Sequence, residues 1–495
     1  MVLRMDRLGG ETVRRSRGVL LPPVNASRVR RRDLFRALHG AVLEGVLAPG
    51  ERLPSSRQAA LDYGVSRGLV EEVYAQLTEE GLLDRSVGRG TFVAASARRL
   101  AAPARRAETA RRSRSPSRRG RAIASNATCR EPPEPRAFNA GIADTRDFPT
   151  RTWLRLQARA ARELGRRALD FADPRGLPAL RASIARHLAQ FRGIRCDASQ
   201  VIIFNSAQQA LYALALLLLD RGDPVWIEDP AYPGARAAFE LASATLTPVP
   251  VDDQGLRVDV GVRLAPRARL AYVTPAHQYP TGAALSLERR IALLDWAEKH
   301  DSWLVDDDYD GEFRYVGQPL TTLYSLDPQA RVLYLGTLSK AMFVSMRLAF
   351  AVVPERLVEP LASLRTHLDG FTPPLPQRAM SLFMDEGHFN SHLRRMRAVY
   401  GEKRAALLAG LAPLADRGWS WPENPAGLHL LLCHPEARHV RRIVNASSLD
   451  LARLEAYRLR PSGRDGLFLR FGGLPESTLH AATAALVAAE RDARR

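Results

Sequence analysis

The sequence predicts an α/β protein with two folded parts, a small winged helix-turn-helix domain followed by a large domain built around a mainly parallel central sheet. Between residues 33 and 94, helical stretches are followed by two short strands, and beyond residue 138 short apolar strands alternate with helical stretches. Between them, residues 95–135 are dominated by Ala, Arg, Pro and Ser and lack apolar periodicity. That composition is typical of a linker.

Length and composition narrow the class of protein. A chain of 495 residues has room for more than one domain and a large core. Its longest apolar run, 210–219, is too short to span a bilayer, and the N-terminus lacks the apolar segment of a secretory signal. The three cysteines are scattered and odd in number, so we expect a protein of the reducing cytoplasm that holds no metal cluster. Because no apolar run is long enough to span a bilayer, we also expect no membrane association.

The positive charge is concentrated in one segment. The chain carries a formal net charge of +19, and residues 98–121 hold ten arginines against the single acid Glu108, a local excess of +10 − 1 = +9. About half of the excess therefore lies in the linker. Such a segment is a solvated tether, a flexible arm that approaches an anionic polymer, or both.

The N-terminal region divides into a leader and a domain. Residues 1–32 are rich in arginine without clear periodicity, and we predict a poorly ordered leader there. From residue 33, apolar residues recur at helical spacing, and two further helices are expected at 56–63 and 66–80 around a Gly64 turn. Two strands at 82–85 and 90–94 form a hairpin, which completes a winged helix.

This region resembles the GntR family of DNA-binding domains through GVLAPGERLPSSRQAA, GVSRGLVEEVYAQL, EEGLL and GRGTFV, which occur in that order. The resemblance implies that arginines of the two helices read base edges, that serines contact phosphates, and that an Arg-Gly pair places the wing. These residues are Ser55, Arg57, Ser66, Arg67, Arg89 and Gly90. Gly68 stands where the family usually has a polar residue, so the base preference stays open.

Lys340 is the first candidate for chemistry in the large domain. The chain holds only three lysines among its 72 basic residues, the others being Lys299 and Lys403. Unlike arginine, a lysine amine can lose its proton and form a Schiff base with a carbonyl group. Lys340 follows a short apolar strand and the polar loop Gly-Thr-Leu-Ser, which places it at the end of a strand.

Other polar and aromatic residues also follow predicted strands. The strands are expected at 201–204, 224–228, 246–251, 270–273, 303–306, 332–335 and 348–352. The first leads into Asn205-Ser206-Ala207 and a long apolar helix, whose free N-terminal amides suit a phosphate. The carboxyl ends of parallel strands meet at one edge of a sheet, so we expect these residues and Lys340 to converge on one crevice.

Here the chain resembles class I, fold-type I aminotransferases, and the order of both domains resembles the MocR-type regulators, through TPAHQYPTG, DDDYDGEFRY and GTLSK. The resemblance implies pyridoxal 5′-phosphate, with Lys340 as the Schiff-base lysine and Asp307 as the acid that keeps the pyridine nitrogen protonated. It assigns the remaining roles as follows: Tyr309 bonds the phenolic oxygen, Tyr232 stacks on the ring, Ser206, Ala207, Ser339 and Arg347 hold the phosphate, and Arg470 binds a substrate carboxylate.

Several positions depart from the aminotransferase pattern. Tyr279, a further expected cofactor neighbour, stands where active aminotransferases often have an asparagine that holds the phenolic oxygen. Ser206 replaces a common glycine, Val344 a proline and Ala349 a glycine. These changes preserve cofactor binding but weaken the case for efficient turnover. His277 is interpreted as a satisfied group behind the site rather than a catalyst.

Three hypotheses follow for the whole chain. The first is a transcription regulator, a homodimer whose head binds double-stranded promoter DNA and whose body senses pyridoxal phosphate or a small amino compound. The second is a metabolic aminotransferase with an incidental head, and the third is a DNA-binding protein with an empty body. The complete residue set favours turnover, whereas the winged helix and basic linker favour regulation, so enzymatic activity stays open. The domains are predicted at 1–32, 33–94, 95–135 and 136–495.

Overall fold

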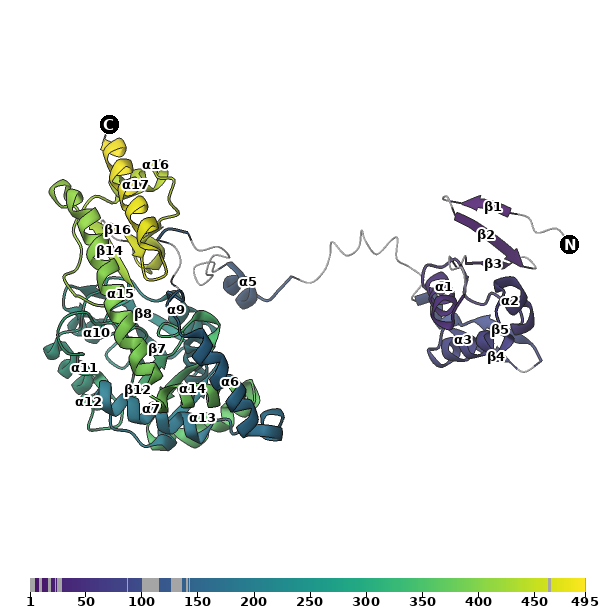
Figure 1. The fold of residues 1–495 in the computed structure, drawn as a ribbon, viewed down its shortest axis with the longest axis horizontal. Coiled ribbons are helices and arrows are strands. Elements are labelled where there is room, and N and C mark those ends of the chain that lie inside the picture. The colour runs from purple at the N-terminus through teal and green to yellow at the C-terminus, as the bar shows by residue number, and fades with distance from the viewer. Residues whose placement is uncertain are drawn as a thin grey trace. The chain divides into compact units, whose positions relative to one another are not determined.

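The computed structural model describes residues 5–8, 11–16, 19–22, 24, 29–86, 88–99, 115–125, 136–138, 141, 143–461 and 464–494. The chain divides into two compact units, Met1–Ser117 and Arg118–Arg495, which we name the head and the body (Figure 1). No helix among the described residues is long and apolar enough to cross a membrane.

The head contains the winged helix-turn-helix that the sequence predicts. Its elements are α1 (Arg31–Leu43), α2 (Ser56–Tyr63), α3 (Arg67–Glu79), β4 (Leu83–Ser86) and β5 (Gly90–Val93). Ser55 Oγ and Ser66 Oγ cap α2 and α3 by accepting bonds from the amides of Gln58 and Leu69. Gly64, at φ 64°, ends α2 in the left-handed conformation that glycine adopts without strain. Strands β4 and β5 pair as an antiparallel hairpin, the wing.

Described parts of the leader and of the linker contain helices and strands that were not expected from the sequence, while linker residues 100–114 and 126–135 lie outside the described residues. Within residues 1–32, β1 (Met5–Leu8), β2 (Glu11–Ser16) and β3 (Val19–Leu21) form an antiparallel three-stranded sheet. Gly-Gly at 9–10 and Gly18 stand between these runs in the sequence, and such glycines are hairpin signals. Within the linker, α5 (Arg118–Ser125) belongs to the body. Its alanines and arginines are good helix formers, although they supply little apolar periodicity.

The body is organised around an eight-stranded sheet in the order β6-β13-β12-β11-β10-β7-β8-β9. Pairs among β12, β11, β10, β7 and β8 are parallel, whereas β13 runs antiparallel to both of its neighbours, and β9 is antiparallel to β8. The seven predicted strands are all present. The bounds are β6 Val201–Phe204, β7 Pro224–Asp229, β8 Thr245–Asp252, β9 Gly255–Leu256, β10 Leu270–Val273, β11 Trp303–Asp308, β12 Val332–Thr337 and β13 Ala349–Val352.

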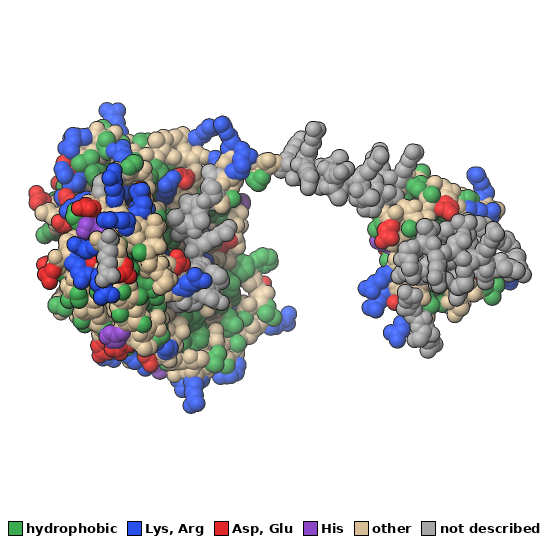
Figure 2. Space-filling view, turned by 90° about the horizontal axis from the view of Figure 1, so that it is seen from above, with side chains coloured by type: hydrophobic (Ala, Val, Ile, Leu, Met, Phe, Trp, Pro, Cys, Tyr) green, Lys and Arg blue, Asp and Glu red, His purple; other side chains and the backbone are tan. Residues whose placement is uncertain are grey.

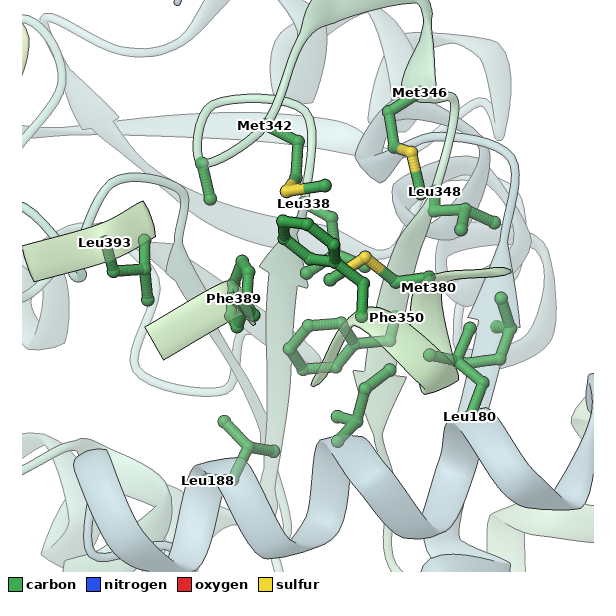
Figure 3. Packing of buried hydrophobic residues seen from close by; sticks show 14 of the residues in the cluster. Leu180, Leu188, Leu338, Met342, Met346, Leu348, Phe350, Met380, Phe389 and Leu393 are labelled. Carbon is green, nitrogen blue, oxygen red and sulfur yellow. The ribbon is translucent and has the colours of Figure 1, made fainter. Parts of the chain in front are cut away.

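Helices cover both faces of this sheet, so its strands are apolar on both sides. Alternate residues of a strand point to opposite faces. In β6, Val201 and Ile203 join one apolar core while Ile202 and Phe204 join the other. Figure 3 shows the first core, where Phe350 of β13 lies among Leu180 and Leu188 of α7, Met380 of α14 and Phe389 of α15.

The helices of the body connect the strands and build the outer layers. Their bounds are α6 Thr150–Leu164, α7 Pro178–Phe191, α8 Ala207–Leu218, α9 Pro233–Leu241, α10 Val258–Leu264, α11 Leu287–His300, α12 Leu323–Leu326, α13 Glu355–Leu368, α14 Pro374–Asp385 and α15 His388–Leu411. On the face of the body seen in Figure 2, basic and acidic side chains are interspersed with apolar ones.

A second, smaller sheet forms the C-terminal part of the body. It has the order β14 (His429–His434), β16 (Asp465–Arg470) and β15 (Ala452–Arg453), and all of its pairs are antiparallel. The helices α16 (Ala437–Ala446) and α17 (Glu476–Arg494) pack with α15 beside this sheet (Figure 1). This packing carries the end of β16, and with it Arg470, towards the large sheet.

Candidate functional site

The strand ends of the large sheet meet in register at one edge. Thr337 at the end of β12 pairs with Ala349 at the start of β13, and Ala349 pairs with Phe204 at the end of β6. Strand β11 continues the row, because Asp308 pairs with Gly336. The register therefore brings these strand ends together, as expected for neighbouring strands of one sheet.

Three loops leave this row side by side and carry the predicted phosphate residues. Ser206, Ser339 and Arg347 each stand two residues from a member of the row formed by Phe204, Thr337 and Ala349. Ala207 opens α8, where the first backbone N–H groups of a helix lack partners within it. Ser206 Oγ accepts from the Gln209 amide at 3.1 Å and keeps its own hydrogen to donate. Arg347 is exposed, so its guanidinium can reach an anion.

Lys340 follows β12 and is half-buried. Its Nζ donates a hydrogen bond to the backbone carbonyl of Gly141, which lies in the segment before α6. This contact between Lys340 and Gly141 is not apparent from the sequence. The bond holds the amine at the strand edge rather than out in solvent.

The three consecutive acids of β11 have different partners. Asp306 Oδ2 accepts the backbone amide of Leu323 at 2.9 Å, and Asp308 Oδ2 accepts the hydroxyl of Tyr334 at 2.6 Å. Asp307 Oδ2 accepts the hydroxyl of Tyr272 at 2.6 Å, while its Oδ1 is buried and has no hydrogen-bond partner among the described residues. Asp308 Oδ1 is likewise buried without a hydrogen-bond partner among the described residues, but Asp308 also forms an ion pair with Arg192. Asp307 has no ion pair among the described residues, so its free oxygen is the one better suited to accept a proton-bearing ligand atom.

Burial dominates the titration of these acids. Desolvation raises the pKa of Asp307 to about 7, opposed by the Tyr272 hydrogen bond and supported by the neighbouring carboxylates. It likewise raises the pKa values of Asp306 and Glu228 to about 7. Glu228 Oε2 accepts the hydroxyl of Thr274 at 2.7 Å. The strand edge therefore holds several carboxyl groups that ionise reluctantly near neutral pH.

Asp307→Asn is expected to stabilise the ligand-free body at high pH. Between pH 4 and 7 the unfolded chain releases the Asp307 proton while the folded body keeps it, so wild-type stability falls as pH rises through this window. The variant lacks this loss, and its advantage in unfolding free energy should grow from pH 4 to 7 to the order of 1–3 kcal/mol. Urea titrations followed by tryptophan fluorescence measure it, since all six tryptophans lie in the body.

Asp295→Asn is the matched control, because Asp295 is an exposed acid on α11. It should change stability by no more than about 0.5 kcal/mol at any of these pH values. A pH-independent difference between Asp307→Asn and the wild type would contradict the raised pKa.

Tyr309 follows β11 directly and touches a buried histidine. Its hydroxyl lies 3.0 Å from His277 Nδ1, and the same nitrogen lies 3.0 Å from Asp310 Oδ2. Burial, reinforced by Asp310 and other nearby groups, raises the pKa of Tyr309 well above its usual value. His277, Asp310 and His429 also place potential metal-ligand atoms within 4.8 Å of one another. Since the hydrogen bonds already engage His277 Nδ1, we interpret this group as a polar network.

Aromatic rings and one arginine lie beside Tyr309. The ring of Tyr279 lies 5.4 Å from that of Tyr232 and 5.7 Å from that of Tyr309, both edge-on. Arg470 donates to the Tyr279 hydroxyl at 3.1 Å and to the Tyr457 hydroxyl at 3.4 Å. The structure thus joins Arg470 of the small sheet to the tyrosines of the large one.

A glycine leaves room beside Tyr232. A Cβ built on Gly234 would lie 2.4 Å from Tyr232 Cε1 and 2.2 Å from Gln208 Oε1. Gln208 in turn donates to the Gly234 carbonyl at 2.8 Å. The start of α9 is therefore held close to α8, and this contact fixes the position of the Tyr232 ring.

The predicted DNA-contacting side chains lie on the exposed surface of the head. Ser55, Arg57, Ser66, Arg67 and Arg89 are all exposed. Arg67 Nε donates to Ser56 Oγ at 3.3 Å, which ties the start of α3 to that of α2. Gly90, at φ 117°, begins the second wing strand, and a Cβ there would lie 3.0 Å from Arg52 Nε.

Several residues of the site escape sequence reasoning. Tyr272 lies inside an apolar strand, and its bond to Asp307 depends on the pairing of β10 with β11. His429 and Tyr457 lie far along the chain and join through the small sheet; the His429 ring is 5.5 Å from that of Tyr279. No local pattern marks these three residues. The run HLLLCH could have indicated a strand that begins at His429.

Comparisons with known proteins agree with both parts of the fold. Residues 138–462 match the family model of aminotransferase class I and II, and residues 30–93 match that of bacterial regulatory proteins of the gntR family. The chain is 35% identical over 453 residues to the probable rhizopine catabolism regulatory protein MocR of Rhizobium meliloti, covering 90% of this chain and 91% of that protein.

One further relative spans most of the chain, and one solved aminotransferase structure resembles the body. The HTH-type pyridoxine biosynthesis transcriptional regulator PdxR of Corynebacterium glutamicum is 31% identical over 450 residues, covering 90% of this chain and 93% of its own. The α-aminoadipate aminotransferase LysN of Thermus thermophilus, solved with N-(5′-phosphopyridoxyl)-L-leucine, superposes with a TM-score of 0.66 at 26% identity. That comparison covers 76% of this chain and 95% of LysN.

Proposed function

Since the chain belongs to the MocR-type transcription regulators, which join a GntR-family winged helix to an aminotransferase class I and II domain, we propose that it regulates transcription through pyridoxal phosphate. The head binds promoter DNA, and the body senses the cofactor or a small amino compound. One observation carries the proposal for the body: Asp307 Oδ1 is buried without a partner among the described residues, at the strand edge that also bears Lys340.

The residues of the body fit this cofactor. Asp307 Oδ1 suits the N–H of a protonated pyridine, and the Tyr272 hydroxyl on Oδ2 fixes the carboxyl group that would accept it. Lys340 offers the amine, and the loops at Ser206, Ser339 and Arg347 offer the phosphate site. When bound, the cofactor supplies an aldehyde that can exchange the lysine amine for that of an incoming compound.

The surrounding residues decide which amino compound can enter. Arg470 presents a fixed cation beside the Tyr279 and Tyr457 hydroxyls, an arrangement suited to a carboxylate. Burial lowers the pKa of His429 well below its usual value, with His277, Arg470 and Lys340 adding to the effect. His429 therefore adds no positive charge near neutral pH. We infer an effector that carries an amine and a carboxylate.

An amino-acid transaminase is the second candidate function. The residue set of Lys340, Asp307 and Arg470 favours it, since these residues would bind, polarise and orient an amino acid. Incubation with amino donors and keto acids, with chromatography of the products, decides between the two. Turnover on the scale of seconds would make the body an enzyme, whereas amine binding without turnover supports a sensor.

The test of regulation is a coupling between the body and the head. A specific site selected from random-sequence DNA serves as the probe, and its affinity is measured for the cofactor-free protein, with pyridoxal phosphate, and with pyridoxal phosphate plus each of the common amino acids. A sensor should change the DNA affinity at least about fivefold in one of these states. Equal affinity in all of them would contradict sensing by the body.

We further propose that the protein is a homodimer in the cytoplasm. Leu169 at 90% and Phe171 at 92% are the most exposed of the large apolar side chains described in the body, and Leu154 on α6 is 58% exposed. Exposure of this kind is typical of an interface. Combined Leu169→Ser and Phe171→Ser should convert a dimer to a monomer at micromolar concentration in sedimentation velocity. Ile291→Ser on α11, where Ile291 is 49% exposed, is the control and should remain dimeric.

A further inference from the structure

One imidazole nitrogen serves two neighbours in the body. His277 Nδ1 lies 3.0 Å from Asp310 Oδ2 and 3.0 Å from the Tyr309 hydroxyl. His277 is 5% exposed and Asp310 3%, so water is largely excluded from both. His277 comes from the loop after β10, and Tyr309 and Asp310 follow directly on β11.

The chemistry of the three groups restricts where the hydrogens lie. A ring nitrogen carries either a hydrogen or a lone pair, so Nδ1 can donate to Asp310 or accept from Tyr309, but not both. The carboxylate of Asp310 can only accept. Nδ1 therefore carries the hydrogen and donates it towards Asp310. The oxygen of Tyr309 then faces an N–H group, and its own hydrogen is left to point elsewhere.

We propose that Asp310 and His277 are positioning residues that make Tyr309 a hydrogen-bond donor to the phenolic oxygen of bound pyridoxal phosphate. This inference rests on the proposed function of the body. Without Asp310, Nδ1 could lose its hydrogen and accept that of Tyr309, which would turn the hydroxyl away from the cofactor. The pair thus sets the direction of the hydroxyl through the tautomer of one histidine.

Two close backbone approaches hold the imidazole in this place. A Cβ on Gly427, at φ 79°, would lie 1.9 Å from His277 Cε1, and one on Gly282, at φ 77°, would lie 3.2 Å from His277 Nε2. Asn424 secures the same region, because its Nδ2 donates to the Gly282 carbonyl at 3.0 Å. The ring is therefore confined from two sides, as a fixed tautomer requires.

Other titratable groups surround the three residues and bear on any pH-dependent measurement. Asp307, Glu228 and Tyr279 help to raise the pKa of Tyr309. The His429 ring stacks 6.3 Å from that of Tyr309. The charge of Asp310 also helps to raise the pKa values of Glu312 and Tyr315. The remaining groups on the cavity shared by His277 and Asp310 are Arg192 and Arg314.

The first test reads the tautomer in the cofactor-free protein. Histidine labelled with ¹⁵N at both ring nitrogens is incorporated, and His277→Gln identifies the His277 signals among the eleven histidines. We expect His277 to carry its hydrogen on Nδ1 in the wild type and to lose this preference in Asp310→Asn. A wild-type His277 protonated on Nε2 alone would overturn the proposal, whether or not the cofactor binds.

The second test reads the bound cofactor by its visible absorbance during a pH titration. Losing a donor to the phenolic oxygen raises the pH midpoint of the absorbance change, so Asp310→Asn and Tyr309→Phe should each raise it by about one unit, a tenfold change in proton affinity. Removing the Asp310 charge alone would lower the midpoint, since a nearby anion favours the protonated form. The sign of the shift therefore separates the two effects.

The double variant decides whether Asp310 acts through Tyr309. In the Tyr309→Phe background, Asp310→Asn should produce no further rise in the midpoint. An equal rise in that background, or a fall in the single variant, would overturn the proposal. A wild type that gains no visible absorbance with pyridoxal phosphate would instead contradict the proposed function, and the tautomer measurement would still decide the role of Asp310.

Discussion

Lys340→Ala is expected to abolish covalent attachment of pyridoxal phosphate to the protein. The wild type, incubated with the cofactor and reduced with borohydride, should carry about one phosphopyridoxyl group per chain on Lys340, and the variant less than about one hundredth of that. The alanine side chain carries no amine, and the arginines of the chain cannot replace the lysine as a nucleophile. Peptide mass spectrometry after reduction locates and counts the label.

The small number of lysines makes this experiment sharp. The other two are Lys299, exposed on α11, and Lys403, whose Nζ donates to Asp144 at 2.6 Å in the interior. Lys299→Ala is therefore the matched control and should label like the wild type. Lys340→Arg preserves the charge at the site and should fail like Lys340→Ala. Label that persists in Lys340→Ala at the wild-type level would remove Lys340 from its proposed role.

Much of the large sheet follows from the sequence because its strands are buried on both faces. A strand such as β6, VIIF, is apolar throughout and is bounded by polar residues, so its position can be read locally. The polar residues near the strand ends can be located for the same reason, since Asp307 lies near the end of β11 and Lys340 comes three residues after β12. Register then brings them to one edge.

The sequence could not predict side-chain contacts between neighbouring strands or between the two sheets. Tyr272 meets Asp307 because β10 pairs with β11, and Arg470 meets Tyr279 because the small sheet packs against the large one. His277 illustrates the same limit, because its Nδ1 lies within hydrogen-bond distance of both Asp310 and Tyr309. The spacing of residues along the chain marks neither Asp310 nor Tyr309 as a neighbour of His277.

Combined Arg57→Ala and Arg67→Ala is expected to remove specific DNA binding while leaving the head folded. Both side chains are exposed at the starts of α2 and α3, and the side-chain caps of these helices come from Ser55 and Ser66, which the change leaves intact. Each arginine that pairs with a base edge is worth about 1–3 kcal/mol of discrimination, so the double variant should bind its selected site about 30-fold to 10⁴-fold more weakly. Fluorescence anisotropy at fixed salt measures the loss.

The dependence on sequence and salt separates base reading from charge alone. If the two arginines read bases, the variant should lose affinity for the selected site far more than for random DNA, whereas a loss of phosphate contacts would weaken both equally. Arg36→Ala, an exposed arginine on α1, is the control and should cost no more than about threefold. Equal losses on both DNAs would assign Arg57 and Arg67 to the phosphates, and base reading would then have to come from the wing at Arg89 or from another part of the head.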